Sequence, residues 1–178
     1  MMQHNDKAVR DNRRQKGRIG EDVAAYYLQQ QGYHILERNW RCRSGELDII
    51  AVAPSESARQ YAAHDWIVEN DAAYNASIDI ISEQADHFQT MLPHKHLAFV
   101  NQSAIIVITE VRSRTGDTHG TAAESVDWRK RKQLRETAAF YAHHTGLHEV
   151  AFRYDVIAVR LNEHDQAVEL EHCIEAFT

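Results

Sequence analysis

The clearest pattern of hydrophobic and polar positions lies in residues 104–114, AIIVITEVRSR. Alternate side chains of a β-strand point to opposite faces, and both faces are apolar here until Glu110. Such a strand is typical of the centre of a sheet that is covered on both sides. Glu110 and Arg112 then share one face at the end of the strand. They could form an ordinary ion pair that ends the strand, or belong to a functional site.

The rest of the pattern predicts two helices and four further strands. Helical periodicity is expected over about 14–31, ended by Gly32, and from 125 or 126 to 144, ended by Gly146. Alternating patterns predict strands over 33–40, 46–52, 149–161 and 167–177. Helices and strands in this order predict an α/β fold in which a mixed central sheet is flanked by helices.

Residues 54–103 are acidic and have a mixed pattern, and we interpret them as a surface insertion within a single domain of residues 1–178. Lengthening a loop from about 10 to about 50 residues costs only about 1–1.5 kcal/mol in closure entropy. Within the insertion, a helix is expected over 75–91 and a strand over 97–100. His94 and His96 could bind a metal, although an isolated pair of this kind usually does not.

Several charged side chains stand where the pattern favours apolar ones. Glu21 lies beside the apolar stripe of the first helix, where the helix dipole alone could explain it. Asp48, between leucine and isoleucines, is a poor strand former and is costly to bury without a partner. Lys130 begins the stripe of the second helix and could simply extend its ammonium to water. Asp155 is expected to pair with Arg153 or another neighbour.

Composition places the chain among globular proteins of one domain, with 178 residues, 43% apolar and 26% charged. No apolar run approaches the roughly 20 residues that span a bilayer. The polar N-terminal residues lack the apolar core of a signal peptide, so the cytoplasm is the expected location. Cys42 and Cys173 are isolated in sequence, which suits a reducing compartment and argues against structural zinc.

The net charge of −6 disfavours nucleic-acid binding only if the charge is averaged over the whole chain. Residues 1–53 carry nine Lys and Arg against seven acids, and residues 104–135 carry seven against four, whereas the remaining segments are acidic. Affinity for phosphate depends on local cations, so these two basic segments leave nucleic-acid binding open. A basic cluster can equally be an ordinary solvated surface.

Two of the unexpected carboxylates suggest a metal centre. If Asp48 and Glu110 lie on adjacent strands about 4 Å apart, their charges repel by about 4 kcal/mol at an effective dielectric constant near 20. Either one of them is protonated or a cation lies between them. An oxygen-only cluster favours Mg²⁺ or Mn²⁺, which can activate water and neutralise charge on a phosphodiester.

Four blocks of the chain together resemble the YraN family of uncharacterised bacterial proteins. They are GRIGEDVAAYYLQQQGYHILERNWRCRSGELDIIA, TEVRSR, HGTAAESVDWRKRKQL and FRYDVIAV. The resemblance covers nearly the whole chain except residues 54–103. The resemblance implies a restriction-endonuclease-like PD-(D/E)xK fold, allied to archaeal Holliday-junction resolvases. It also implies an acidic cluster of Glu21, Asp48 and Glu110, and Glu46 matches a further family position whose role is less clear.

The chain departs from the family pattern at one position. The usual Glu-x-Lys is Glu110-Val111-Arg112 here. The family lysine is thought to position or deprotonate the attacking water, whereas arginine keeps the charge but cannot act as a base. Our hypothesis is that Lys130 supplies the missing ammonium from the facing helix. The rival hypothesis is a site that has lost its catalytic activity and only binds protein or nucleic acid.

The resemblance and the residues together predict a Mg²⁺- or Mn²⁺-dependent nuclease acting on branched or single-stranded DNA, or a nucleic-acid-binding relative. Asp48, Glu110 and the carbonyl of Val111 would ligate the metal, Glu21 would close the site, and Arg112 and Lys130 would stabilise phosphate. Nucleic-acid contacts are expected from Arg13, Arg14, Arg18, Arg41, Arg43 and Arg114.

The alternative is a catalytically inactive adaptor that binds protein or nucleic acid, with the acidic insertion as the surface for a protein partner. A homodimer is expected only by analogy with the resolvases.

Overall fold

The computed structural model describes residues 3–54, 100, 104–115 and 121–178, with side chains from residue 11 onward. The helices and strands predicted outside 54–103 are all present. In chain order they are α1 (Gln3–Gln30), β1 (His34–Cys42), β2 (Gly45–Val52), β3 (Ile105–Thr115), the short 3₁₀ helix η2 (Ala123–Ser125), α4 (Trp128–Thr145), β4 (Ala151–Leu161) and β5 (Ala167–Phe177). The helix predicted over 75–91, residues 97–99 of the strand predicted over 97–100 and the pair His94 and His96 lie outside the described residues, and Val100 is not part of a strand.

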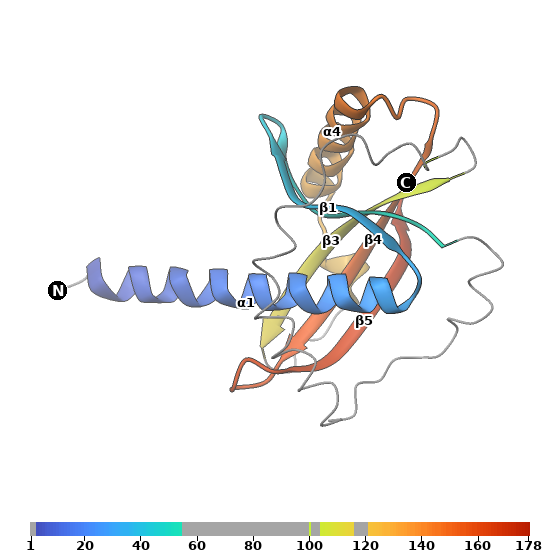
Figure 1. The fold of residues 1–178 in the computed structure, drawn as a ribbon. Coiled ribbons are helices and arrows are strands. Elements are labelled where there is room, and N and C mark those ends of the chain that lie inside the picture. Colours follow the sequence, from blue (N-terminus) through green and yellow to red (C-terminus); the bar gives the residue numbers. More distant parts are fainter. Residues whose placement is uncertain (1–2, 55–99, 101–103, 116–120) are drawn as a thin grey trace.

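The strands form one mixed sheet in the order β1-β2-β3-β4-β5 (Figure 1). β3 and β4 are parallel, and the other neighbours are antiparallel. β3 therefore occupies the centre of the sheet, as its two apolar faces predict. Ile106, Val107 and Ile108 on this strand are each at most 1% exposed.

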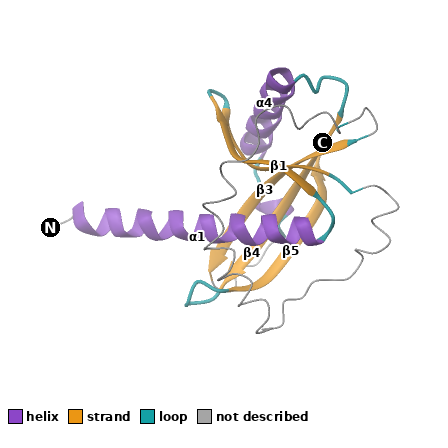
Figure 2. Cartoon of the chain, viewed as in Figure 1, coloured by secondary structure: helices purple, strands orange, loops and turns teal. Residues whose placement is uncertain are grey.

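One helix covers each face of the sheet, so the prediction of a mixed α/β fold is confirmed (Figure 2). α1 packs Val23, Ala24 and Leu28 against side chains of β2, β3 and β4. On the opposite face, α4 packs Leu134, Ala138 and Tyr141 against the same strands, as its predicted stripe requires. Each fully buried aliphatic side chain contributes roughly 1.5–3 kcal/mol to folding.

The ends of α4 follow from local sequence. Asp127 caps its first turn, its carboxylate accepting the backbone N–H of Lys130 at 2.9 Å. Gly146 ends it in the left-handed conformation, at φ 75°, which glycine adopts without steric cost. α1 is longer than predicted, and its N-terminal part extends beyond the sheet (Figure 1). No helix among the described residues combines the length and the apolar character needed to cross a bilayer.

Close contact between α1 and β3 at Gly20 gives a prediction about stability. A Cβ atom at Gly20 would lie 1.8 Å from Ser113 Oγ and 3.1 Å from Ser113 Cβ. We expect Gly20→Ala to lower the free energy of unfolding by about 1–2 kcal/mol, because overpacking outweighs the gain in helix propensity. Urea titration of Gly20→Ala and of Gly20→Ala/Ser113→Gly checks this. A Gly20→Ala protein with the same free energy of unfolding as wild type would contradict the close packing of α1 on β3.

A buried polar cluster under α1 joins β4 to β5. Asp155, fully buried, accepts two hydrogen bonds from Arg153 (2.8 and 2.6 Å) and the backbone N–H of Glu175 (2.9 Å), and lies 3.0 Å from His172 Nε2. Arg153 also donates to the hydroxyl of Tyr33. Burial alone would raise the pKa of Asp155, but the hydrogen bonds from His172 and Arg153 outweigh it and hold that pKa below its usual range. The predicted pairing of Asp155 with Arg153 is confirmed.

Candidate active site

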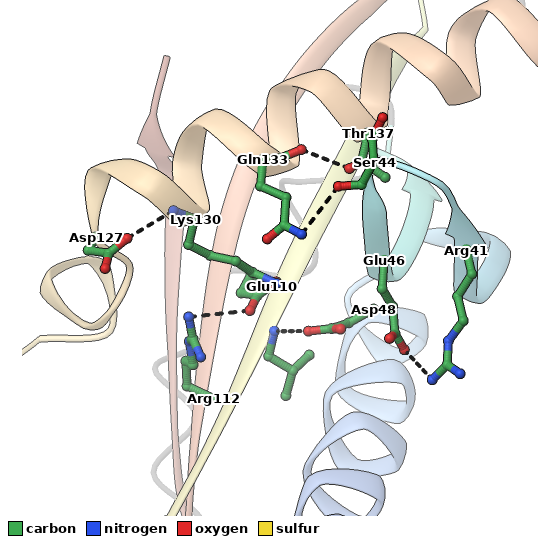
Figure 3. Close-up of polar contacts among 11 residues, drawn as sticks. Arg41, Ser44, Glu46, Asp48, Glu110, Arg112, Asp127, Lys130, Gln133 and Thr137 are labelled. Atoms are coloured by element: carbon green, nitrogen blue, oxygen red, sulfur yellow. Dashed lines mark hydrogen bonds and ion pairs between the residues drawn. The ribbon is translucent and has the colours of Figure 1, made fainter.

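The site begins where β2 and β3 separate. Their paired register runs from Val52 and Ile106 to Ile49 and Thr109. Beyond this register, one residue along β2 and two along β3, the Asp48 carboxylate accepts the backbone N–H of Val111 at 2.8 Å (Figure 3). A side-chain oxygen thus satisfies a backbone donor at the end of the ladder. This contact fixes an acidic group in the fork between the two strands.

The alternation of β2 breaks at the same residue. Leu47 and Ile50 both belong to the apolar cluster under α4, whereas Ile49 belongs to the cluster under α1. Strict alternation would place Leu47 and Ile49 on the same face, so the strand departs from it between these two residues. On β1, Asn39 lies between the residues that pair with Ile49 and Leu47 and has a left-handed φ of 53°. This irregular backbone changes the alternation and leaves Asp48 directed along the sheet toward β3.

Glu110 occupies the α4 side of β3 and meets two cations. It is 3% exposed, with Lys130 Nζ 3.0 Å from its Oε2 and Arg112 Nη2 3.4 Å from its Oε1. Lys130 reaches it from the first turn of α4, and Arg112 lies two residues further along β3 (Figure 3). A buried carboxylate requires such partners, because its desolvation costs several kcal/mol. The two candidate cations from separate parts of the sequence therefore converge on one carboxylate.

The charges of this cluster shift the pKa of each acid. Burial raises the pKa of Glu110 to about 7, the negative charge of Asp48 adds to the shift, and Lys130 and Arg112 oppose it. Burial also raises the pKa of Asp48, against the hydrogen bond from Val111 and the charge of Lys130. Raised carboxyl pKa values beside cations are typical of sites that bind a further cation or transfer a proton.

Glu21 approaches this cluster from the other side of the sheet. It belongs to α1, and its Oε2 accepts a hydrogen bond from Asn39 Nδ2 at 2.9 Å. Partial burial raises its pKa, the bond from Asn39 opposes the shift, and the charge of Asp48 adds to it. The negative charge of Asp48 thus raises the pKa of both Glu21 and Glu110. Among the described residues, however, no three His, Cys, Asp or Glu side chains are arranged to hold a metal ion.

The predicted phosphate contacts are distributed over three elements. Arg13, Arg14 and Arg18 are exposed on α1. In the β1–β2 hairpin, Arg41 near the end of β1 pairs with Glu46 of β2 at 2.9 Å, and the guanidinium of Arg43 in the turn lies 4.9 Å from the centre of the Phe140 ring. Arg114 on β3 is 3.7 Å from Glu171 of β5.

Two polar residues of the site were missed in the sequence. Asn39 orients Glu21, and Gln133 of α4 donates to the carbonyl of Ser44 at 3.2 Å, which attaches the β1–β2 turn to the helix that carries Lys130. Asparagine tolerates left-handed backbone better than most residues, so an asparagine inside a strand could have indicated the irregularity. Gln133 gave no such signal.

The titration of Glu110 is a direct prediction of this geometry. In metal-free protein, ¹³C NMR of its carboxyl carbon should give an apparent pKa of about 7, which should fall in Asp48→Asn and rise in Lys130→Met. Folding raises the pKa of Glu110 from its ordinary value of 4.5. Its contribution to the free energy of unfolding is therefore complete below pH 4.5 and is lost as the pH rises through about 7. A pKa that stays near 4.5 in all three proteins would contradict the buried cluster.

Comparison with known proteins places this arrangement in a family. The model of the family described as "Uncharacterised protein family UPF0102" matches residues 20–159, a span that includes Glu21, Asp48, Glu110 and Lys130. The chain belongs to this family. The resemblance to the YraN family is thereby confirmed, whereas the family match says nothing about the PD-(D/E)xK fold.

Members of the UPF0102 family resemble the chain over nearly its whole length. A UPF0102 protein of Moorella thermoacetica is 34% identical over 165 residues, covering 93% of this chain and 97% of its own. One from Pelotomaculum thermopropionicum is 30% identical and covers 94% and 98%. One from Clostridium acetobutylicum is 30% identical and covers 90% and 92%. The UPF0102 relatives and this chain are therefore similar from end to end.

Proposed function

We propose that the fork between β2 and β3 is the centre of a metal-dependent nuclease that hydrolyses phosphodiester bonds. One observation carries the proposal: the buried carboxylate of Glu110 lies beside Asp48, which raises its pKa, and meets Lys130 and Arg112. Acids and cations gathered at the end of a central strand can both activate water and stabilise a charged phosphate. A structural ion pair at a strand end needs neither the second acid nor the second cation.

The donor set fits a hard divalent cation. Asp48 and Glu110 offer carboxylate oxygens only, and their raised pKa values mean that an added positive charge would be stabilising there. Asp48, Glu110 and the carbonyl of Val111 would hold Mg²⁺ or Mn²⁺, with Glu21 closing the site from α1. When bound, such an ion lowers the pKa of a coordinated water and neutralises phosphate charge.

The chain's own cations account for the remaining roles. Arg112 cannot be deprotonated, so it binds phosphate and does not serve as a base. Lys130 takes the place of the lysine that this family usually carries two residues after the glutamate, and its ammonium stabilises the developing negative charge. The exposed arginines of α1 and the β1–β2 turn hold the nucleic-acid backbone without reading sequence. The substrate proposed is DNA with branched or single-stranded segments.

The proposal includes the architecture and the assembly that the resemblance implies. A mixed sheet with an acid at a strand fork and a glutamate from the first helix agrees with a restriction-endonuclease-like fold allied to resolvases. The resolvases that the resemblance points to are dimers, so a homodimer is the assembly that we propose by analogy.

A second candidate function is a non-catalytic adaptor that binds protein or nucleic acid. It is favoured by one specific observation: both oxygens of Glu110 already face a cation, Lys130 at 3.0 Å and Arg112 at 3.4 Å. In that case the cluster is a stable internal salt bridge, and the residue 54–103 insertion would contact a protein partner.

A cleavage assay separates the two functions. The purified protein is offered flaps, four-way junctions, single strands and RNA with Mg²⁺ or Mn²⁺, beside Asp48→Ala. Glu136→Gln is the matched control, because it removes an exposed carboxylate of α4 that pairs with Lys132. Metal-dependent cutting that is lost in Asp48→Ala alone supports the nuclease. Binding that is indifferent to Asp48 and to metal, without cutting, supports the adaptor.

A further inference from the structure

The first turn of α4 exposes a large aromatic side chain beside the site. Trp128 is 67% exposed, more than any other large hydrophobic side chain in the described part of the chain. It belongs to neither apolar cluster. A tryptophan left in water contributes nothing to the core, and exposed aromatic side chains more often belong to binding surfaces.

The surroundings of Trp128 are cationic. The guanidinium of Arg129 lies 5.4 Å from the centre of the indole ring. Residues 129–132 read Arg-Lys-Arg-Lys, whereas the nearby acids are Glu124 and Asp127. The Asp127 carboxylate keeps its charge while it caps the helix, but four cations against two acids over residues 124–132 leave this segment with a net positive charge. Charge complementarity therefore favours an anionic partner over a basic or apolar one.

The position of Trp128 relative to the catalytic groups is fixed by the helix. It precedes Lys130 by two residues, which is about 3 Å along the axis and about 200° around it. Lys130 faces β3 and Glu110, so Trp128 lies on the outer side of the first turn of α4, where it is exposed. A single strand whose phosphate contacts Lys130 would reach the indole further along its length, where it passes around the start of the helix.

We propose that Trp128 stacks on an unpaired nucleobase of the same strand whose phosphate is held at Lys130. This rests on the proposed function and names its substrate class as DNA with a single-stranded segment. The bases of an intact duplex are already stacked on each other, whereas an exposed indole with an arginine on it is a platform for a free base. A protein partner could use a tryptophan equally well, but the basic residues around this one favour a polyanion.

Binding of an abasic oligonucleotide tests the stacking without any cleavage. Two labelled single strands of equal length and charge, one with normal bases and one with a run of abasic sites, are titrated in EDTA with the full chain. The wild type should bind the strand with bases about tenfold more tightly, a typical effect of one stacked base. Trp128→Ala should bind both strands alike, and Trp128→Phe should restore part of the difference.

Ile174→Ala is the matched control, since it removes another exposed apolar side chain (56%) from β5. It should keep the wild-type difference. A wild type without preference for the strand with bases, a preference that survives in Trp128→Ala, or an equal loss of both affinities would overturn the stacking. None of these results would affect metal-dependent cleavage that is lost in Asp48→Ala. Conversely, a protein that does not cleave could still bind the strand with bases more tightly through Trp128, so the two proposals fail separately.

Discussion

Lys130→Met is expected to lower the rate of metal-dependent cleavage by about 10²–10³-fold while the protein stays folded. The ammonium is 3.0 Å from the buried Glu110 carboxylate, and removing one group that stabilises developing charge typically costs a factor of this size. Its charge also lowers the pKa of Glu110, so the variant should hold that acid protonated to higher pH. The pH profile of the single-turnover rate should therefore move upward.

Three further variants make this result specific. Lys132→Met removes a neighbouring lysine that is largely exposed and pairs with Glu136, and it should cleave like wild type. Lys130→Arg should keep part of the activity if the group only stabilises charge, and none if it must accept a proton. Arg112→Lys restores the family residue and should retain cleavage. Unchanged cleavage in Lys130→Met would show that Lys130 has only a structural role.

Asp155→Ala is expected to lower the free energy of unfolding by about 3–5 kcal/mol, the typical cost of removing one partner from a buried ion pair. The change leaves the Arg153 guanidinium without its two carboxylate bonds and the Glu175 N–H without an acceptor. The pKa of Asp155 is lowered in the folded protein, so its stabilising contribution is complete above the unfolded value of 3.8. The contribution is lost as the pH falls below that value.

Urea titration at pH 7 and near pH 3 measures both effects. The difference between wild type and Asp155→Ala should shrink at the lower pH. Glu169→Gln breaks an exposed pair with Arg160 on the same two strands, and it should change stability by less than about 1 kcal/mol. Equal effects of the two substitutions would contradict the buried cluster.

The arrangement of helices and strands could be predicted because burial determines it. Apolar runs such as residues 104–109 are compatible only with a covered strand, and the stripe of Leu134, Ala138 and Tyr141 only with a helix against that sheet. The extent of α1 could not be predicted, since residues 3–13 have no apolar stripe to mark them. The contact of His172 with Asp155 depends on the β4–β5 pairing, and the hydrogen bond from Arg153 to Tyr33 joins residues 120 positions apart, so local sequence specifies neither.

The site was predictable residue by residue but not in its geometry. A carboxylate amid isoleucines and a lysine at the start of an apolar stripe are each costly, so Asp48, Glu110 and Lys130 were visible in the sequence. The direction of Asp48 was not visible, because it depends on the left-handed Asn39 on the neighbouring strand. The sequence also did not show that each oxygen of Glu110 faces a cation, because this depends on the distance between α4 and the sheet.

Anomalous diffraction from crystals grown with Mn²⁺ tests the central claim most directly. The account predicts one strong peak in the fork, about 2.0–2.6 Å from oxygens of Asp48 and Glu110, with the ammonium of Lys130 moved away from Glu110. The peak should be absent in Asp48→Asn. Crystals of wild type that show no peak there, with Lys130 still paired to Glu110, would contradict a metal-dependent nuclease at this site.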